Sequence, residues 1–253
     1  MIKGRLHSIE TLGTLDGPGL RTVFFMQGCN MKCLYCHNRD SWSLNGGREF
    51  SLDELISTVI SYREYYGEEG GVTFSGGEPL LQADFLIDVV KELKAMYIHT
   101  AIDTSGSLFN EKTRKLFGLA DLIILDIKHA RKNEYKSVCS YPGEMAFANL
   151  AFLQESNKKY WVRQVIVDGY TDDERQVEEL KNLLQFGKTG RSDSPCNSDY
   201  PEKSVNKPER IELLPYHAMG KEKWLTCGMA YPLTGMEPPS TGRMRLLESI
   251  IQR

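Results

Sequence analysis

Three cysteines stand within eight residues of one another, Cys29, Cys33 and Cys36. Thiolates are soft ligands that select zinc, copper(I) or iron–sulfur clusters. A structural zinc site closes with four ligands, and a [4Fe–4S] cluster commonly takes four cysteines. Here three are close, so one iron of a cluster would lack a protein ligand and could bind a small molecule. An open coordination position is typical of a catalytic metal.

The alternative is a Cys3His zinc site in which His37 is the fourth ligand. A self-contained zinc finger needs ligands on two separated elements, and the remaining cysteines, Cys139, Cys196 and Cys227, offer no second pair. These three are more typical of buried small hydrophobic residues or surface thiols. The spacing therefore favours an iron–sulfur cluster over zinc.

The elements that must position these thiols alternate between strand and helix patterns. Strands are predicted at 20–26, 71–74, 98–102, 122–127, 161–167 and 210–214. Helices are predicted at 51–65, 84–95, 111–118 and 172–186, with further helical sequence between 131 and 155. Ser51 and Glu54 form a capping box at the start of the first helix.

Six strand–helix units in a row predict parallel strands joined by right-handed crossovers, as a doubly wound sheet or a (β/α) barrel. Ligands bind at the carboxyl ends of such strands. The unusual polar residues follow those ends: the cysteine loop, Gly76-Gly77-Glu78, Asp103-Thr104, Asp126-Ile127-Lys128 and His217. A barrel brings all of them to one mouth, so we predict an α/β fold with a partial (β/α)6 barrel.

Composition excludes several classes of function. The chain has 253 residues, a formal charge of −3 and 41% hydrophobic residues, so no basic field attracts nucleic acid. No apolar run approaches the length of a membrane span, and the N-terminus has no apolar signal region, which predicts a cytoplasmic protein. We expect one domain over 1–253, with 187–208 as a flexible loop on the face opposite the site.

The cysteine motif, with Tyr35 before the last cysteine, resembles the signature of the radical S-adenosylmethionine (SAM) superfamily. The wider sequence is similar to the glycyl-radical-enzyme activases that act on pyruvate formate-lyase. The matching segments run in order along nearly the whole chain: HSIETLGTLDGPGLRTVFFMQGC (7–29), CLYCHNRDSW (33–42), VTFSGGEPLLQ (72–82), HTAIDTSG (99–106), LDIK (125–128) and IELLPYHAMGKEKW (211–224).

The resemblance implies that the open iron binds SAM through its amino and carboxylate groups, with Glu78 accepting the amino group. It places the cofactor against Tyr35, Cys36, His37, Gly76, Gly77, Glu78, Ile127, Lys128, His129 and His217. It also implies a monovalent cation at Asp103, Thr104 and Asp126. Without the resemblance, the Gly-Gly-Glu sequence is an ordinary turn and the Asp and Thr residues are equally typical of strand-end caps.

In such a protein the reduced cluster cleaves SAM, and the 5′-deoxyadenosyl radical takes hydrogen from a glycine Cα of the partner. We expect Asp16 and Arg163 to contact that partner, although both are equally typical of turn and salt-bridge residues. Several activases of other glycyl-radical enzymes carry a cysteine-rich insert between the first cluster and the Gly-Gly-Glu sequence. No such insert lies between Cys36 and Glu78, so the expected partner is pyruvate formate-lyase. The expected electron donor is a flavodoxin or ferredoxin. Alternatives are a radical SAM enzyme on another glycyl-radical enzyme or a small molecule, and, more distantly, a zinc-binding interaction protein.

Overall fold

The computed structural model describes residues 2–186 and 205–252. Its centre is an open eight-stranded sheet in the order β3-β1-β2-β4-β5-β6-β7-β8. The strands are β1 (Gly4–Gly13), β2 (Arg21–Met26), β3 (Arg48–Phe50), β4 (Gly71–Gly76), β5 (His99–Thr104), β6 (Leu122–Asp126), β7 (Lys159–Ile166) and β8 (Arg210–Pro215). The six predicted strands are all present and all parallel to one another, which confirms the partial barrel.

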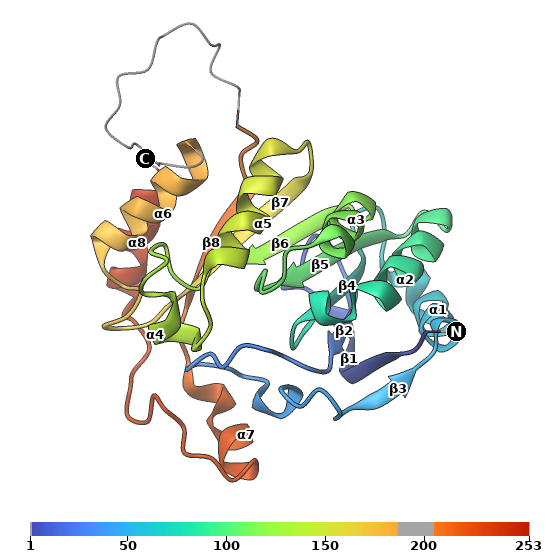
Figure 1. Ribbon diagram of the computed structural model, residues 1–253, viewed down its shortest axis with the longest axis horizontal. Helices are drawn as coiled ribbons and strands as arrows, with labels where there is room; N and C mark the ends of the chain where they lie inside the picture. The colour runs from blue at the N-terminus through green and yellow to red at the C-terminus, as the bar shows by residue number, and fades with distance from the viewer. Residues whose placement is uncertain (1, 187–204, 253) are drawn as a thin grey trace, which may run out of the picture.

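Helices follow the parallel strands and cover the sheet (Figure 1). The α-helices are α1 (Leu52–Tyr62), α2 (Ala83–Ala95), α3 (Glu111–Leu119), α4 (Tyr135–Cys139), α5 (Glu144–Glu155), α6 (Glu174–Phe186), α7 (Lys221–Thr226) and α8 (Thr241–Gln252). Short 3-10 helices are η1 (Arg39–Ser41), η2 (Arg63–Tyr65), η3 (Pro79–Gln82) and η4 (Ala218–Gly220). The predicted capping box at Ser51 and Glu54 is present at α1.

The sequence pattern did not predict β1 and β3, which extend the sheet beyond β2. Both pairs that β1 makes, with β2 and with β3, are antiparallel. Its register against β2 shifts twice, between Leu6 and Ser8 and between Glu10 and Gly13. Bulges of this kind interrupt the period-two alternation by which a strand is recognised.

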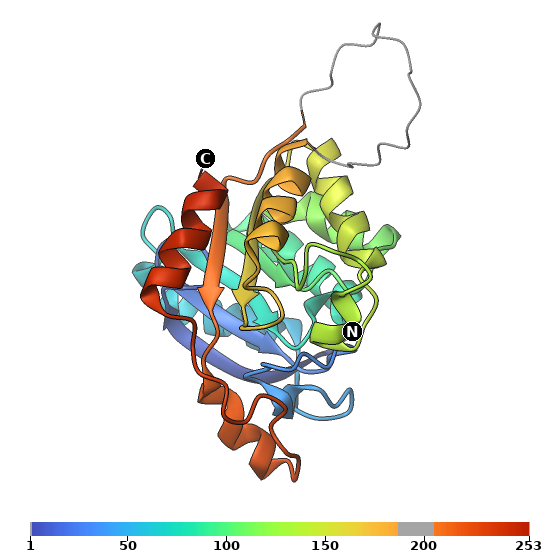
Figure 2. The same cartoon turned by 90° about the vertical axis from the view of Figure 1, so that its left-hand side faces the viewer.

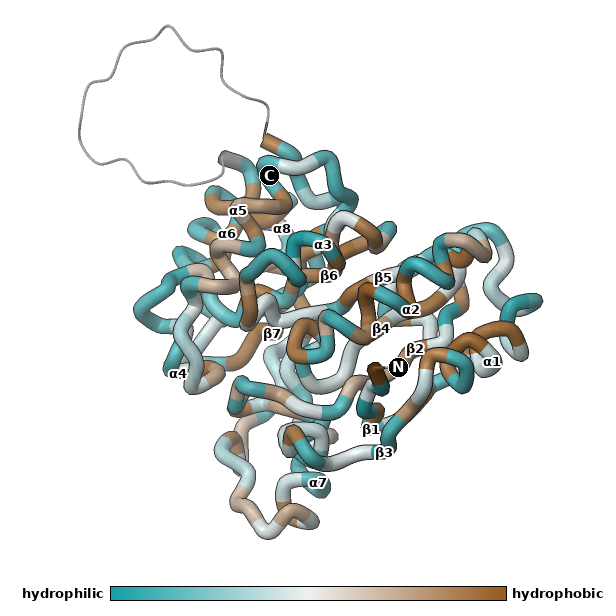
Figure 3. The backbone as a smooth tube through the Cα atoms, turned by 45° about the vertical axis from the view of Figure 1, so that its right-hand side comes forward, coloured by the Kyte–Doolittle hydropathy of each residue, from teal (hydrophilic) through white to brown (hydrophobic). Residues whose placement is uncertain are grey.

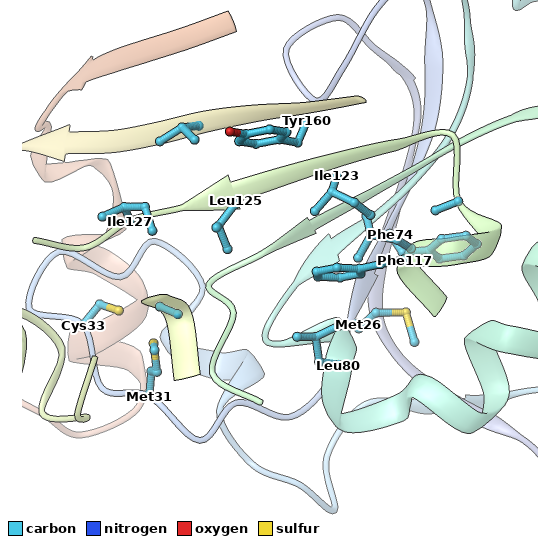
Figure 4. Packing of buried hydrophobic residues seen from close by; sticks show 14 of the residues in the cluster. Met26, Met31, Cys33, Phe74, Leu80, Phe117, Ile123, Leu125, Ile127 and Tyr160 are labelled. Carbon is cyan, nitrogen blue, oxygen red and sulfur yellow. The ribbon is translucent and has the colours of Figure 1, made fainter. Parts of the chain in front are cut away.

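The core lies between the strands and the helices. In Figure 3 the most hydrophobic backbone, drawn in brown, includes parts of α2 and β4. Phe24 of β2 and Phe74 of β4 are fully buried and stack at 5.7 Å between ring centroids. Cys33 belongs to the same buried cluster, and in Figure 4 it lies toward the end of the core near Ile127, away from Phe117.

The carboxyl ends of β7 and β8 point toward α7, as the strand arrows in Figure 2 show. The predicted 187–208 loop joins α6 to β8 and lies outside the described residues except for its last four. There Asn206 is fixed, because its side chain donates to the carbonyls of Leu153 and Lys158 at 3.0 and 2.7 Å. Among residues 2–186 and 205–252, no helix is long and apolar enough to cross a membrane.

Candidate cluster and cofactor site

The three cysteines lie on one loop after β2, and backbone hydrogen bonds close that loop on itself. Gly28 N donates to Ser41 O at 2.7 Å, and Cys29 N donates to Trp42 O at 3.3 Å. On its other side the loop is fixed to the end of α4, where Lys32 N donates to Cys139 O at 2.9 Å. The thiols are therefore held on a rigid loop at the carboxyl end of the sheet.

Burial makes these thiols poor acids in the absence of a metal. It raises the pKa of Cys29 to about 12 and raises the pKa values of Cys33 and Cys36 above their ordinary range. A thiolate here would need the positive charge of iron beside it. Two N–H groups already face the sulfurs: Met31 N donates to Cys29 Sγ at 3.4 Å, and Trp42 Nε1 donates to Cys36 Sγ at 3.2 Å.

The ring of His37 is engaged away from the thiols. It packs against the ring of His217 at a tilt of 34°, with 4.1 Å between centroids, and its Nε2 lies 3.1 Å from the carbonyl oxygen of His217. Within the described ranges, no three His, Cys, Asp or Glu side chains are placed to hold a single metal ion. A cubane cluster makes a different demand, since each cysteine binds its own iron. Three soft ligands on one loop fit that demand.

Lys128 brings a positive charge to the loop. Its Nζ lies 5.5 Å from the ring centroid of Tyr35 and 2.5 Å from Asp126 Oδ2. Burial, the largest single effect, would lower the pKa of Lys128, but the charge and hydrogen bond of Asp126 together with Tyr35 and Cys33 outweigh it and raise that pKa above its ordinary value. The side chain therefore stays protonated and can receive an anionic group.

Three buried polar atoms around the loop have no hydrogen-bond partner: Tyr35 Oη, Asp126 Oδ1 and His217 Nδ1. A buried polar atom left unpaired costs about 1–3 kcal/mol, so such atoms are rare unless a ligand completes them. All three belong to residues that the sequence assigned to SAM or the nearby cation. The site therefore has unused hydrogen-bonding capacity where the cofactor was predicted.

Gly76 and Gly77 allow two backbone segments to approach each other closely, a role that the sequence did not predict. Gly76 has φ +99°, and a Cβ there would lie 2.5 Å from Met26 N. At Gly77 a Cβ would lie 2.2 Å from the carbonyl oxygen of Gly28. The space beside both glycines is thus filled by the end of β2 and the start of the cysteine loop. The glycines let β4 approach the loop closely.

Glu78 is fully buried and accepts four hydrogen bonds. Oε1 accepts from Leu80 N at 3.0 Å and Thr104 Oγ1 at 2.5 Å, and Oε2 accepts from Ser105 N at 3.1 Å and from the Ser105 hydroxyl. These donors occupy the lone-pair sites of a carboxylate. Glu78 therefore ties the end of β4 to the end of β5.

Asp103, Thr104 and Asp126 each have a protein partner. Asp103 Oδ2 accepts from Ser75 Oγ at 2.9 Å, Thr104 bonds to Glu78, and Asp126 pairs with Lys128. The three lie on neighbouring strands β5 and β6, as predicted. Their joint binding of a cation stays a prediction.

Asp16 and Arg163, which are far apart in the sequence, lie close together in the structure. The Arg163 guanidinium donates to the carbonyl of Leu15, beside Asp16. It also pairs with Glu212 at 2.5 Å and with Asp103 at 3.4 Å. Burial raises the pKa of Asp16, and the positive charge of Arg163 partly offsets that effect. Arg163 thus fixes the loop that carries Asp16.

Ile127 and His129 lie beside the site, and the polar groups of both residues already have hydrogen-bond partners in the protein. The Ile127 side chain is fully buried in the core, and its N–H donates to Arg163 O at 2.8 Å. His129 Nδ1 accepts from Arg131 N at 2.9 Å, and its Nε2 lies 3.2 Å from Tyr170 O. Both residues position neighbouring backbone in this structure.

Sequence reasoning gave no role to Trp42 and Trp224, which the structure brings to the cysteine loop, or to Arg21 and Thr73, which hold the segment that carries Asp16. Trp42 donates to a cysteine sulfur, and Trp224 Nε1 donates to the carbonyl of Cys36 at 2.9 Å. Both tryptophans lie inside the matched segments, but the indole N–H carries no signal in a one-dimensional pattern. The partners of Arg21 and Thr73 are equally invisible without the fold.

The chain is similar to a family of iron–sulfur domains and to named activating enzymes. A family model described as a 4Fe-4S single cluster domain matches residues 15–140. The chain is 36% identical to the pyruvate formate-lyase 1-activating enzyme of Escherichia coli, over 99% of this chain and 96% of that protein. It is 37% identical to the pyruvate formate-lyase-activating enzyme of Clostridium pasteurianum, over 100% and 98% of the two chains.

Solved structures show similar folds. A domain of a pyruvate-formate lyase-activating enzyme from Bacteroides vulgatus has a TM-score of 0.55 and 26% identity, covering 72% of this chain and 93% of that chain. A radical SAM methyltransferase from Sphaerobacter thermophilus has a TM-score of 0.59 and 18% identity, covering 92% and 63% of the two chains. The latter likeness concerns the fold alone.

Proposed function

Since the chain belongs to the pyruvate formate-lyase activating enzyme family of radical SAM proteins, we propose that it generates a glycyl radical on pyruvate formate-lyase. A [4Fe–4S] cluster and SAM supply the chemistry: reductive cleavage of SAM yields a radical that takes hydrogen from a glycine Cα of the partner. The observation that carries this proposal is the three-thiol loop surrounded by three unpaired buried polar atoms.

In this proposal Cys29, Cys33 and Cys36 hold three irons, and the fourth iron is left for SAM. The loop arrives preorganised, because hydrogen bonds fix both its ends before any cluster binds. The buried thiols lose their protons as iron binds, so cluster assembly releases protons. Three cysteines and no fourth ligand are what an open iron requires.

SAM would lie against the unpaired atoms. Lys128, held protonated by Asp126, would pair with the methionine carboxylate through a charge-assisted hydrogen bond. His217 Nδ1 and Tyr35 Oη would gain partners from the polar groups of the cofactor. The adjacent rings of His37 and His217 offer an aromatic surface beside the loop for the adenine.

The remaining predicted residues would orient the cofactor, bind a cation and contact the partner. Glu78 would accept a hydrogen bond from the SAM amino group in place of one of its present donors, while its remaining bonds hold β4 to β5. A monovalent cation would be bound by Asp103, Thr104 and Asp126, whose oxygen atoms are hard ligands. Asp16 and Arg163 would bind the glycine loop of the partner. A flavodoxin or ferredoxin would deliver the electron.

The test begins with anaerobic purification, counting of iron, and electron paramagnetic resonance of the reduced chain with and without SAM. We expect about four irons per chain and a spectrum that SAM changes. Incubation with pyruvate formate-lyase deuterated at its glycines should yield a glycyl radical and deuterium in 5′-deoxyadenosine. Zinc in place of iron, or unlabelled 5′-deoxyadenosine with no radical on the partner, would contradict the proposal.

A matched pair of variants assigns the ligands. Cys33→Ala should lose the cluster, whereas Cys139→Ala should retain about four irons, although Cys139 is also buried and its carbonyl contacts the same loop. Equal loss of iron in the two variants would mean that the loop is sensitive to any packing defect, and Cys33 would then not be identified as a ligand.

A further inference from the structure

Trp42 is positioned so that its indole N–H faces a cysteine sulfur. Nε1 lies 3.2 Å from Cys36 Sγ, within hydrogen-bond reach of a sulfur acceptor. The main chain of Trp42 is fixed as well, because its carbonyl accepts from Cys29 N. Trp42 therefore contacts two of the three cysteines, one through its backbone and one through its side chain.

Two neighbours hold the indole ring in this orientation. The Arg39 guanidinium carbon lies 4.1 Å from the Trp42 ring centroid, on one face of the ring. Trp224 of α7 packs edge-on at 5.2 Å and is itself buried. The Trp224 N–H is directed to the carbonyl of Cys36 and not to its sulfur. The two tryptophans thus donate to different atoms of the same cysteine.

We propose that Trp42 is a positioning residue that makes the cluster easier to reduce, by donating its N–H to the sulfur of Cys36. The inference rests on the proposed role of Cys29, Cys33 and Cys36 as cluster ligands. Hydrogen bonds to ligating sulfurs tune the potential of an iron–sulfur cluster. Reduction adds negative charge that the sulfurs share, so an N–H donor stabilises the reduced state more than the oxidised state.

The measurement is a redox titration of the reconstituted full chain, followed by electron paramagnetic resonance. Trp42→Phe removes the N–H and keeps an aromatic ring against Trp224. At a fixed applied potential we expect the ratio of reduced to oxidised cluster to fall about tenfold, a shift of about 59 mV for one electron. The matched control is Trp224→Phe, which removes an indole N–H that donates to the carbonyl of Cys36 and not to its sulfur. In this variant the ratio of reduced to oxidised cluster should change less than twofold.

A second readout reports on the proton itself. Electron–nuclear double resonance of the reduced wild type should show a proton coupled to the cluster that exchanges with deuterium and is absent from Trp42→Phe. If Trp42→Phe does not assemble a cluster, 3-benzothienylalanine at position 42 replaces the N–H by sulfur and keeps the ring shape. It should give the same shift.

The outcomes separate this inference from the function on which it rests. A wild-type chain that binds zinc in place of iron overturns both. A full cluster whose potential is unchanged by Trp42→Phe, or by the benzothienyl residue, overturns the role of Trp42 alone. An equal shift in Trp224→Phe also overturns it, because the effect would then come from packing and not from the bond to sulfur.

Discussion

Lys128 Nζ lies 2.5 Å from Asp126 Oδ2, and the two side chains are only 10% and 19% exposed. The other oxygen of this carboxylate, Oδ1, is buried and has no partner. The pair is therefore electrically balanced but incompletely hydrogen-bonded. A ligand that donates a hydrogen bond to Asp126 Oδ1, or accepts one from Lys128, would complete the hydrogen bonding of this pair.

Replacing Lys128 by Met should destabilise the chain by about 3 kcal/mol, because the Asp126 carboxylate is left buried without a counter-charge. Urea unfolding of the anaerobic protein measures this loss. The double variant Lys128→Met, Asp126→Leu should recover part of the stability, and both variants should bind SAM more weakly. A double variant no more stable than the single one would contradict the argument.

Ser105 supplies two of the four hydrogen bonds to Glu78. Ser105→Ala removes the hydroxyl and should lower the free energy of unfolding by about 1.5–3 kcal/mol, since the lost bond is to a buried charged group. Ser107→Ala is the matched control, because the Ser107 hydroxyl bonds to a neutral amide, Asn30 Oδ1, at 2.7 Å. Its loss should be smaller.

The same variant tests the role of Glu78 toward SAM. If the SAM amino group donates to Glu78, the cofactor can supply the donor that Ser105→Ala lacks. The stability difference between wild type and variant should then shrink when SAM is added. A difference of the same size with and without SAM would show that Glu78 only joins β4 to β5.

The six parallel strands and the polar residues at their carboxyl ends could be predicted from the sequence, because buried parallel strands are continuous apolar runs bounded by polar loops. β1 could not, since its bulges break the alternation. The sequence pattern also did not predict the last helix, α8. Its buried positions, Met244, Leu247 and Ile250, are only three apolar residues spaced three apart, which is a short signal for a helix.

The candidate site was predicted as a set of residues but not as a network. The sequence pattern placed Glu78 and Asp103 at strand ends and named Arg163 as a partner contact, and the structure adds that Arg163 pairs with Asp103. It could not reveal that Glu78 is saturated by donors, because this depends on the register of β4 against β5. Side-chain donors such as the Trp42 indole depend in the same way on how the loop closes.

Asp16→Asn should make the chain more stable at neutral pH. Burial raises the pKa of Asp16 above its ordinary value of 3.8, so the folded state holds this proton more tightly than the unfolded state. Ionisation then costs stability as the pH rises from 3.8 through the raised pKa. Thermal unfolding of the cluster-free chain from pH 4 to pH 8 should show the advantage of the variant growing with pH and then levelling. A constant difference would contradict it.

Thr73 links the buried Arg21 to the loop that carries Asp16. Its hydroxyl accepts from Arg21 Nε at 2.6 Å and donates to the carbonyl of Asp16 at 2.6 Å, and Arg21 also donates to Pro18 O at 2.9 Å. Thr73→Val keeps the shape and removes both bonds. Because the loop is then less firmly held, KM for the partner should rise several-fold.

The cluster and SAM lie outside this link, so SAM affinity and the reduced spectrum of Thr73→Val should match the wild type. Thr113→Val is a suitable control: Thr113 is also buried and its hydroxyl makes only long bonds of 3.4 Å, far from Asp16 in the sequence. It should leave KM unchanged. If Thr73→Val instead lowered kcat with KM unchanged, the hydroxyl would act on the chemistry, and the loop around Asp16 would not be the element that receives the partner.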